Sequence, residues 1–405
     1  MRKSFSEKKS QPHIAIACGG TGGHLFPGLA VGEELARCGC AVTLLISPKD
    51  VDQQAVKSVS GMAVETLPAV ALTGKNIFGF AFGFLKSFLA ARKLFKKNPP
   101  AAVLAMGGFT SAPPVFAGKF LGAKTFLHES NTIPGKANRW LARFVDEAFV
   151  YFPETASRLH ARETEVIGMP VRPQFLEAMD PSAARRALGL EADRPVLLVM
   201  GGSQGASGIN DLILSALPLL TEAAPEMQFL HLTGVRDFEK VKAAYTAQKC
   251  RAVVRAFLSE MDLALGAATV AVSRSGASSL AELAATKLPS ILIPYPTAAD
   301  NHQFFNAVAF AAEGAASIAK QTHTKPERVA REIVSLMSDL DLRRGMKAAL
   351  AKWHTPDSAR QIAQRITRLI GAVEIISEKN LVPAKLGNIP SIKSRNALKP
   401  ETANV

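Results

Sequence analysis

The stretch His13-Ile14-Ala15-Ile16-Ala17-Cys18, followed by Gly19-Gly20-Thr21-Gly22-Gly23-His24, places an apolar strand directly before a glycine-rich loop. The same device recurs at Pro195–Met200, followed by Gly201-Gly202-Ser203-Gln204-Gly205. Glycine lets the backbone adopt positive φ angles and lets a ligand approach the main chain closely. A helix that begins after such a loop directs N–H groups and the positive end of its dipole at that ligand. Two such loops predict two similar α/β domains that face a shared cleft.

The chain is long enough for two domains, because 405 residues with 48% hydrophobic and 20% charged content can bury two cores. Short β-rich runs alternate with helical periodicity, which predicts parallel sheets with helices on both faces. In the first block we expect strands at 13–18, 41–47, 63–67, 101–106, 124–128 and 147–152, and helices at 25–38, 77–97, 111–121 and 134–144. In the second block we expect strands at 195–200, 227–232, 252–257, 270–273 and 290–294, and helices at 182–188, 207–224, 236–247, 278–286, 301–313, 325–338, 341–353 and 356–371.

The segment Gly168-Met169-Pro170-Val171-Arg172-Pro173 interrupts this alternation, and its two prolines and glycine indicate a linker between domains. We therefore expect a first domain at 12–169 and a second at 170–355. The last helix, 356–372, is expected to pack back on the first domain. Residues 373–405 are polar and interrupted by prolines, which predicts a disordered tail.

Charge and cysteine usage narrow the class of protein. The net charge is +14, and the stretch from Thr66 to Phe144 holds eleven Lys or Arg but one acid, Glu129. Such a field favours nucleic acid, acidic phospholipid or a phosphorylated substrate. The four cysteines lack metal-ligand or redox spacing, so we expect reduced thiols in a cytosolic protein. Met1–Gln11 is polar and no uncharged apolar run reaches membrane-spanning length, so neither a signal peptide nor a transmembrane helix is expected.

The first glycine loop does not fit the dinucleotide fingerprint. G-x-G-x-x-G would need a glycine at position 25, where Leu25 stands, so NAD or FAD binding is not expected. His24 follows the glycines at the start of a helix. It is either a capping or packing histidine or, because it lies at the expected cleft, a general base. Two further loops, 107–111 and 128–131, also follow predicted strands and should line the same edge of the sheet.

Three segments of the second block have the chemistry of a nucleotide-sugar site. The loop 202–205 offers main-chain N–H groups and the Ser203 hydroxyl, which suit a pyrophosphate unless Ser203 merely caps the helix. Glu282, early in a helix after Ser273–Gly276, can bind a ribose diol or act only as a capping-box acid. Asp300-Asn301-His302-Gln303 opens another helix with groups that suit sugar hydroxyls or phosphate.

The helix expected at 77–97 combines aromatic and basic residues. It contains six of the 22 phenylalanines, Phe78, Phe80, Phe82, Phe84, Phe88 and Phe95, together with Lys86, Arg92, Lys93, Lys96 and Lys97. The pattern fits either a buried helix with a solvated end or a helix that lies on an anionic membrane surface. Nucleic acid is not an expected partner, since no nucleic-acid-binding motif accompanies the charge. The D-x-D segment Asp339-Leu340-Asp341 lies between two predicted late helices and is interpreted as surface charge and helix capping, so no metal site is expected.

The motifs together resemble those of the MurG glycosyltransferases, which add N-acetylglucosamine (GlcNAc) to the lipid-linked muramoyl-pentapeptide precursor of bacterial peptidoglycan. The matching segments, in the family's order, are GGTGGHLFPGLA (19–30), GGF (107–109), HESN (128–131), GMPVR (168–172), GGSQGA (201–206), SRSGASSLAE (273–282) and DNHQ..NA (300–307). The resemblance covers about residues 13–370. It implies the GT-B fold, in which two Rossmann-like domains face a deep cleft, with the acceptor on the N-terminal side and UDP-GlcNAc on the C-terminal side.

The resemblance also implies roles for individual residues. His24 would be the general base or would position the acceptor, with Glu129 or a water as the alternative base. The acceptor diphosphate would lie on the glycines of the first domain, Gly19, Gly20, Gly107 and Gly108. Residues expected to contact UDP-GlcNAc are Thr21, Gly22, Gly23, Asn131, Arg172, Ser203, Leu258, Ala277, Ser278, Glu282, His302 and Gln303. Among these, Glu282 would bind the ribose, the main chain around Leu258 would face the uracil, and Asn131 would reach the transferred sugar.

A member of this family would work without cofactor or metal, bound peripherally at the cytoplasmic face of the bacterial inner membrane. Phe84, Lys86, Phe88, Arg92, Lys93, Lys96 and Lys97 would then dock on anionic lipid, and proteins of cell-wall synthesis become candidate partners. Three positions depart from the family's usual residues, with Phe109 for tyrosine, Ser130 for glutamine and Met169 for asparagine. Two other functions remain open: a UDP-GlcNAc 2-epimerase, and a non-catalytic, membrane-docked UDP-sugar sensor.

Overall fold

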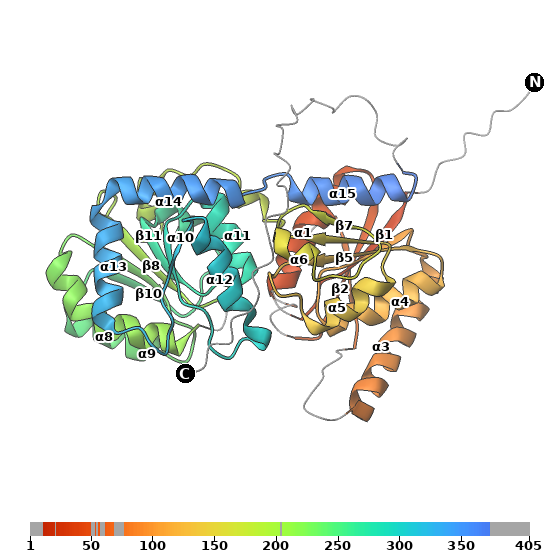
Figure 1. The fold of residues 1–405 in the computed structure, drawn as a ribbon, viewed down its shortest axis with the longest axis horizontal. Coiled ribbons are helices and arrows are strands. Elements are labelled where there is room, and N and C mark those ends of the chain that lie inside the picture. Colours follow the sequence, from red (N-terminus) through yellow and green to blue (C-terminus); the bar gives the residue numbers. More distant parts are fainter. Residues whose placement is uncertain are drawn as a thin grey trace, which may run out of the picture.

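Two parallel β-sheets, each covered by helices, form the two halves of the molecule (Figure 1). The computed structural model describes residues 11–20, 22–49, 53, 56, 61–68, 77–202 and 205–372. The first half contains the seven-stranded sheet and the second half a six-stranded sheet. The predicted α/β class with two Rossmann-like sheets is confirmed.

The first sheet has the strand order β3-β2-β1-β4-β5-β6-β7, and every neighbouring pair is parallel. Its strands are β1 (His13–Ala17), β2 (Ala41–Ile46), β3 (Ala63–Thr66), β4 (Ala102–Ala105), β5 (Lys124–Glu129), β6 (Glu147–Val150) and β7 (Thr164–Val166). Its helices are α1 (Gly22–Arg37), α3 (Ile77–Lys97), α4 (Ala112–Phe120), α5 (Lys136–Leu141) and α6 (Pro153–Ala156), with 3₁₀ turns η1 (Phe109–Ser111) and η2 (Ala142–Phe144). The central strand β1 is buried along its whole length: Ile14–Ala17 are apolar, and the His13 imidazole hydrogen-bonds the Thr43 hydroxyl of β2 over 2.9 Å.

The second sheet repeats this plan in the order β10-β9-β8-β11-β12-β13, again with parallel pairs. Its strands are β8 (Val196–Met200), β9 (Gln228–Leu232), β10 (Ala252–Arg255), β11 (Val270–Ser273), β12 (Ser290–Leu292) and β13 (Ser317–Ile318). Its helices are α7 (Pro181–Ala187), α8 (Ser207–Ala223), α9 (Phe238–Ala247), α10 (Met261–Ala267), α11 (Ala277–Thr286), α12 (His302–Ala312), α13 (Pro326–Ser338) and α14 (Leu340–Trp353), with 3₁₀ turns η3 (Pro173–Phe175) and η4 (Ala299–Asn301).

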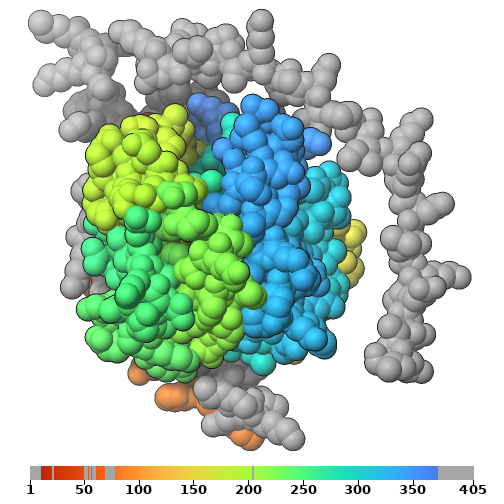
Figure 2. All heavy atoms as spheres, turned by 90° about the vertical axis from the view of Figure 1, so that its left-hand side faces the viewer, coloured from red at the N-terminus to blue at the C-terminus, as the bar shows by residue number. Residues whose placement is uncertain are grey.

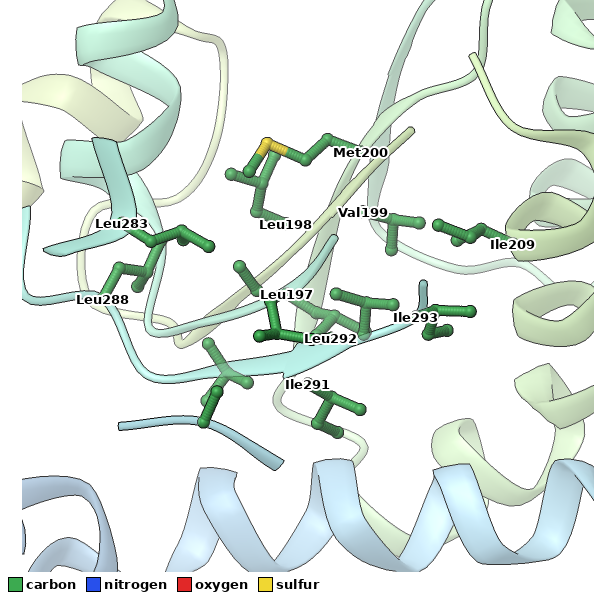
Figure 3. Close-up of a cluster of buried hydrophobic side chains, with 14 of the residues drawn as sticks. Leu197, Leu198, Val199, Met200, Ile209, Leu283, Leu288, Ile291, Leu292 and Ile293 are labelled. Atoms are coloured by element: carbon green, nitrogen blue, oxygen red, sulfur yellow. The ribbon is translucent and has the colours of Figure 1, made fainter. Parts of the chain in front are cut away.

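Aliphatic side chains hold the helices of the second domain to its sheet (Figure 3). Leu197–Met200 of β8 and Ile291–Ile293 lie between Ile209 of α8 and Leu283 of α11, and all of them are at most 4% exposed. Because strands of a parallel sheet are covered on both faces, such continuous apolar runs are expected. The core fixes the strand ends, and with them the loops at the edge of the sheet.

The last two helices run along the same side of the molecule, with α14 on the second domain and α15 (Ser358–Leu369) on the first (Figure 1). Ile362, Ala363 and Ile366 of α15 are fully buried in the core that contains Ile14 and Leu35. In Figure 2 the part of the chain that contains α13 and α14 forms a continuous blue band on the outer face of the second domain. The tail expected to be disordered, 373–405, lies outside the described residues.

The helix α3 has an inward and an outward face. Ser87, Ala91 and Phe95 are fully buried against the first domain, whereas Phe78 and Phe82 are 89% and 71% exposed. The end of α3 projects from the body of the first domain (Figure 1). Within the part of the chain that the structure describes, no helix is long and apolar enough to cross a membrane.

Candidate active site

The glycine loops lie where the order of the strands reverses. In the first sheet, Gly19 follows β1 and Gly107 follows β4, and these two strands are neighbours. In the second sheet, Gly201 follows β8 and Gly276 follows β11, which are also neighbours. Ligands of open α/β sheets bind at such switch points, beyond the carboxyl ends of the strands. Thr21 and Ser203, both expected to contact a ligand, lie outside the described residues.

Close packing explains why the first loop needs glycine. A Cβ atom at Gly19 would lie 2.3 Å from the backbone nitrogen of Ser47, and Gly20 has φ +120°. The hydroxyl of Thr110 donates to the Gly19 carbonyl over 2.9 Å, and the Lys49 ammonium donates to the Gly20 carbonyl over the same distance. The hydrogen bond from Thr110 thereby fixes this loop to η1, the turn that follows Gly107 and Gly108.

His24 lies in the first turn of α1, with its imidazole against Gly107 and Gly108. A Cβ at Gly107 would lie 2.9 Å from Nε2 of His24, and one at Gly108 would lie 3.6 Å from Cε1. Both glycines have positive φ, +123° and +79°. Any side chain at position 107 would therefore displace the ring. The structure thus brings together His24 and the two loops predicted to hold an acceptor diphosphate.

Two buried side chains at the end of the neighbouring strand β5 fix the segments around Gly168 and around 131–138. The Nε2–H of His128 donates to the Gly168 carbonyl over 2.9 Å, and burial lowers the pKa of His128 to about 4, so it is neutral near pH 7. Glu129 accepts four hydrogen bonds, from the main chain of Asn131 and Gly135 and from the side-chain amides of Asn131 and Asn138. With its oxygens occupied in this way and 2% exposure, Glu129 anchors the loop rather than being placed to accept a proton from a substrate.

Asn306 of α12 uses all four of its amide hydrogen-bonding positions, three of them to the first domain and one to Ser275 of its own domain. Its Oδ1 accepts from the backbone N–H of Thr132, over 2.9 Å, and from the Thr132 hydroxyl, over 3.0 Å. Its Nδ2 donates to Oδ1 of Asn131 and to the Ser275 carbonyl, over 3.0 and 3.2 Å. Because two of these partners are main-chain groups of fixed polarity, the orientation of the amide is fixed as well. Asn131 in turn donates to Glu129, which leaves its Oδ1 one further lone pair.

Arg172, in the segment that links the two domains, forms an ion pair with Glu282 of α11. The closest Arg172 nitrogen lies 3.5 Å from Oε1 of Glu282, and both side chains are 16% exposed. The guanidinium lies over the rings of Phe26 and Phe175, at 4.4 and 4.8 Å from their centroids. Burial raises the pKa of Glu282 to about 7, and the charge of Arg172 opposes this shift. Glu282 therefore pairs with Arg172 instead of closing a capping box.

The start of α11 contacts the start of α1 directly. The hydroxyl of Ser278 donates to the Gly23 carbonyl over 3.2 Å. Ala277 is 7% exposed and begins α11 after Gly276. Gly23 immediately precedes His24, so the candidate base lies one residue from the helix expected to bind the donor. Gly22 begins α1 and packs against Phe26.

The other donor candidates lie on α12 and on the loop before it. Gln303 accepts from the backbone N–H of Tyr295 over 3.0 Å through Oε1, and His302 contacts the Ala299 carbonyl over 2.8 Å through Nδ1. Before them, Asp300 and Asn301 adopt φ values of +49° and +54°. Asp300 accepts from Arg139 of the first domain over 2.8 Å. Leu258, in the loop after β10, is half-buried and packs against the second core.

The second glycine loop is as tightly constrained as the first. Gly202 has φ +93°, and a Cβ at Gly205 would lie 2.1 Å from the Thr233 carbonyl oxygen. That carbonyl accepts from Asn210 of α8 over 3.0 Å, and Asn210 also donates to Asp237 over 2.8 Å. Ser207 donates to Asp237 as well. These contacts hold the amino end of α8 at the edge of the sheet, where its N–H groups can face an anion.

Three residues that the sequence assigned no role help to build the site. Asn306 and Thr132 make the contact between domains described above. Arg274 is 7% exposed and donates to the Ile293 and Pro294 carbonyls, over 3.0 and 3.1 Å, which fixes the loop before Tyr295. Asn306 belongs to the motif at 300–307 and Arg274 to the motif at 273–282. Their hydrogen-bond partners are remote in the sequence, so no local pattern predicted these contacts.

The predicted membrane residues divide between the two faces of α3. Phe84 and Phe88 are half-buried and pack against the first core, whereas the five cations Lys86, Arg92, Lys93, Lys96 and Lys97 are all exposed. The apolar side chains of this helix that face outward are Phe78, Phe82, Leu85 and Leu89, and the first two belong to the aromatic pattern described from the sequence.

Within the described ranges, no group of three His, Cys, Asp or Glu side chains is placed to hold a metal ion. The Asp339 side chain of the D-x-D segment accepts from the backbone N–H groups of Asp341 and Leu342, at 2.9 Å each. Asp339 therefore caps α14, as the sequence predicted.

Comparison with protein families matches both halves of the chain. Residues 14–150 match the glycosyltransferase family 28 N-terminal domain, and residues 196–366 match its C-terminal domain. A relative from Anaeromyxobacter sp. (strain Fw109-5) is 35% identical over 363 residues, which cover 88% of this chain and 93% of that protein. One from Synechococcus elongatus is 36% identical, with coverage of 89% and 99%. Both are named UDP-N-acetylglucosamine--N-acetylmuramyl-(pentapeptide) pyrophosphoryl-undecaprenol N-acetylglucosamine transferase.

Among solved structures, MurG of Acinetobacter baumannii superposes with a TM-score of 0.69 at 26% identity, covering 88% of this chain and 99% of that one. A UDP-N-acetylglucosamine 2-epimerase superposes with a TM-score of 0.63 at 12% identity, covering 89% and 97%, and so shares the fold alone. The two matched domains and the near-complete coverage of the relatives lead to one assignment: the chain belongs to the MurG family of glycosyltransferases.

Proposed function

We propose that this protein transfers GlcNAc from UDP-GlcNAc to the C4 hydroxyl of the muramoyl unit of undecaprenyl-diphospho-muramoyl-pentapeptide. The observation that carries this proposal is the hydrogen bond from Ser278 to the carbonyl of Gly23, because it places His24 beside the first turn of α11. An acceptor held on the glycines of the first domain would then meet a donor held by the second. The names of the relatives supply the identity of both substrates.

In the proposed reaction the acceptor oxygen attacks the anomeric carbon of GlcNAc from the face opposite UDP. The C–O bond to the diphosphate breaks, its electron pair leaves with UDP, and the new bond is β-1,4. The acceptor hydroxyl loses its proton to His24 as the new bond forms, which is the task of a general base. Glu129 is a poorer candidate for this task, because four hydrogen bonds already occupy its oxygens.

Negative charge builds up on UDP as it departs, and the second domain offers positive ends of dipoles to stabilise it. The loop 201–205 leads into α8, and the helices α11 and α12 begin at the same edge of the sheet. Oriented N–H groups at helix starts stabilise such an anion without a proton transfer. We assign Glu282 to the ribose, Gln303 and His302 to the sugar and diphosphate, and Asn131 to the transferred GlcNAc.

We further propose that the protein works on the cytoplasmic face of the bacterial inner membrane, docked through α3. The outward Phe78 and Phe82, on the same helix as exposed cations such as Lys93, match the composition of a helix that lies on anionic lipid. Such a position would bring the first domain to a membrane-embedded acceptor. It would also bring the protein close to other proteins of cell-wall synthesis and link it to cell shape and division.

The 2-epimerase alternative is not favoured, because the relatives with 35–36% identity are named as transferases whereas the epimerase shares only the fold. A test incubates the protein with UDP-GlcNAc, with and without the solubilised muramoyl acceptor, and identifies the products by mass spectrometry. We expect an acceptor that gains one N-acetylhexosamine, only when both substrates are present. A UDP-sugar epimer formed without acceptor would support the epimerase, and donor binding without any product would support the sensor.

A further inference from the structure

A pocket lined by apolar and aromatic side chains opens on the first domain, next to the glycines that contact His24. Phe80, Ala81 and Phe84 of α3 form one wall, Phe109 of η1 another, and Trp140 of α5 closes it. Its volume is about 480 Å³, within the usual range for pockets that bind small molecules. Such a lining offers no hydrogen-bonding partner, so it selects a ligand by its apolar shape.

The rings around the pocket support one another. Phe80 and Phe109 meet edge to face with centroids 5.4 Å apart, and Phe84 meets Trp140 edge to face at 6.4 Å. Behind them, Phe116 of α4 contacts Trp140 at 5.2 Å. Aromatic pairs in these geometries stabilise each other beyond their buried area. The pocket is therefore formed by aromatic rings that pack against one another.

Phe109 connects the pocket to Gly107 and Gly108, two of the glycines proposed to hold the acceptor diphosphate. It follows Gly107 and Gly108 directly in the chain, and those two glycines form the surface against which the His24 imidazole lies. The hydroxyl of Ser111, at the end of the same 3₁₀ turn, donates to the Gly107 carbonyl over 2.6 Å and to the Ala17 carbonyl over 3.0 Å. These bonds fix Phe109 relative to the glycines. A ligand whose diphosphate lies on Gly107–Gly108 would have its next atoms beside Phe109.

We propose that this aromatic pocket binds the first isoprene units of the polyprenyl chain of the acceptor. The inference rests on the proposed function, which supplies a diphosphate with a prenyl group on one side and a sugar on the other. The diphosphate on the glycines then orients the molecule, with the prenyl group towards Phe109 and the muramoyl hydroxyl towards His24. The pocket is distinct from the outward face of α3, where Phe78 and Phe82 are exposed.

The test uses two water-soluble acceptors in solution without membrane or detergent. Both are muramoyl-pentapeptide diphosphates. The first carries a chain of two isoprene units on its diphosphate, and the second carries a methyl group at the same position. The readout is the ratio of kcat/KM for the prenyl acceptor to kcat/KM for the methyl acceptor. For the unaltered protein we expect a ratio of about ten or more, since burial of several methylene groups supplies that factor.

Two kinds of variant should reduce this ratio to roughly one to three. Phe109→Ala removes the wall next to Gly107 and Gly108, and Ala81→Phe fills the pocket without removing any packing from the core. The matched control is Phe120→Ala, an aromatic truncation on α4 at a side chain that is 76% exposed and does not line the pocket. We expect this control to keep the ratio of the unaltered protein.

The outcomes separate the inference from the function on which it rests. A ratio near one in the unaltered protein, with both acceptors turned over, would overturn the prenyl subsite and leave the transferase intact. An unchanged ratio in both Phe109→Ala and Ala81→Phe would overturn it too. Absence of turnover with either acceptor, while UDP-GlcNAc binds, would contradict the proposed function and the inference together.

Discussion

At the scale of single residues, the imidazole of His24 has the most direct chemical task. It lies against Gly107 and Gly108 and one residue from the contact with Ser278. Replacing it by alanine should lower kcat by about a hundredfold or more, the usual contribution of a general base. The affinity for UDP should stay within about twofold, because UDP is proposed to bind the other domain. Steady-state kinetics and calorimetric titration with UDP measure the two quantities, and unchanged kcat in His24→Ala would remove the residue from the mechanism.

The buried carboxyl group of Glu282 predicts a pH dependence of donor binding. Burial raises its pKa to about 7, so it is ionised above this pH and protonated below it. The ionised form offers two charged acceptor oxygens to the hydroxyls of a ribose diol, whereas protonation turns one of them into a donor and weakens the other as an acceptor. We therefore expect the Kd of UDP to rise as the pH falls from 8 to 6. Titration calorimetry across this range should show the change, and Glu282→Gln should bind weakly with little pH dependence. The same UDP affinity at pH 6 and pH 8 in the unaltered protein would count against the assignment.

Substitution of Asn306 should lower kcat/KM for UDP-GlcNAc more than it weakens the affinity for UDP. Asn306→Asp replaces the Nδ2 group that donates to Asn131 and Ser275 with an oxygen that repels both acceptors. If Asn131 accepts from the transferred sugar, its displacement should lower kcat/KM for UDP-GlcNAc about tenfold or more, the scale of a lost buried hydrogen bond. The Kd of UDP, which lacks that sugar, should change less than about threefold.

The milder variant Thr132→Val is the control for Asn306. It removes one hydroxyl donor but keeps the main-chain N–H that orients the amide. We expect a loss of kcat/KM of no more than about threefold. If Asn306→Asp lowered the affinities for UDP and UDP-GlcNAc equally, the residue would have only a structural role.

Several contacts of individual side chains could not be predicted from the sequence. The sequence identified His24, Arg172 and Glu282, but not that Arg172 and Glu282 pair with each other. It left Glu129 open as a base, because the four donors that occupy its oxygens come from a loop whose course the sequence does not specify. Asn306 received no role for a similar reason, since its partner Thr132 lies 174 positions earlier in the chain.

At the scale of elements, α3 predicts binding to anionic lipid. Reversing the charge at Lys93, Lys96 and Lys97 should lower retention on vesicles that contain phosphatidylglycerol by roughly a hundredfold, since each cation near such a surface contributes about 1 kcal/mol. Cosedimentation with vesicles measures this, and turnover of a soluble short-chain acceptor should not change.

A matched set of charge reversals on α14 separates local docking from net charge. Arg344, Lys347 and Lys352 are exposed on the second domain, and replacing all three by glutamate changes the net charge equally. This control should remain on the vesicles to within about threefold. Equal loss in both sets would show that only the overall charge matters, and that α3 is not the docking element.

The helices and strands were predictable where the sequence pattern is long. β1 and β8 are runs of buried aliphatic residues, and α13 and α14 follow the predicted ranges closely. β7 and β13, with three and two residues, are too short to show a period, and α10 was missed with seven residues. The helix expected at 134–144 instead ends at Leu141 and continues as a 3₁₀ turn, so its boundaries were wrong.

At the scale of the whole molecule, the repeated glycine loops predicted two similar domains, and the two sheets confirm it. The contacts that join the domains could not be predicted from the sequence, because each of them pairs residues that are far apart in the chain and belong to different local patterns. Ser278 with Gly23, Asn306 with Thr132 and Arg139 with Asp300 all cross the boundary. The domain limits of 12–169 and 170–355 remain proposals for the design of separate fragments.

The central claim concerns the whole molecule, since it needs an acceptor on one domain and a donor on the other. Release of UDP from UDP-GlcNAc, with EDTA present and with or without the solubilised lipid-linked muramoyl-pentapeptide, tests it most directly. We predict release that depends on the acceptor and persists in EDTA, because main-chain N–H groups and helix dipoles are proposed to stabilise the departing UDP. UDP release at the same rate without acceptor, or none with both substrates bound, would contradict the account.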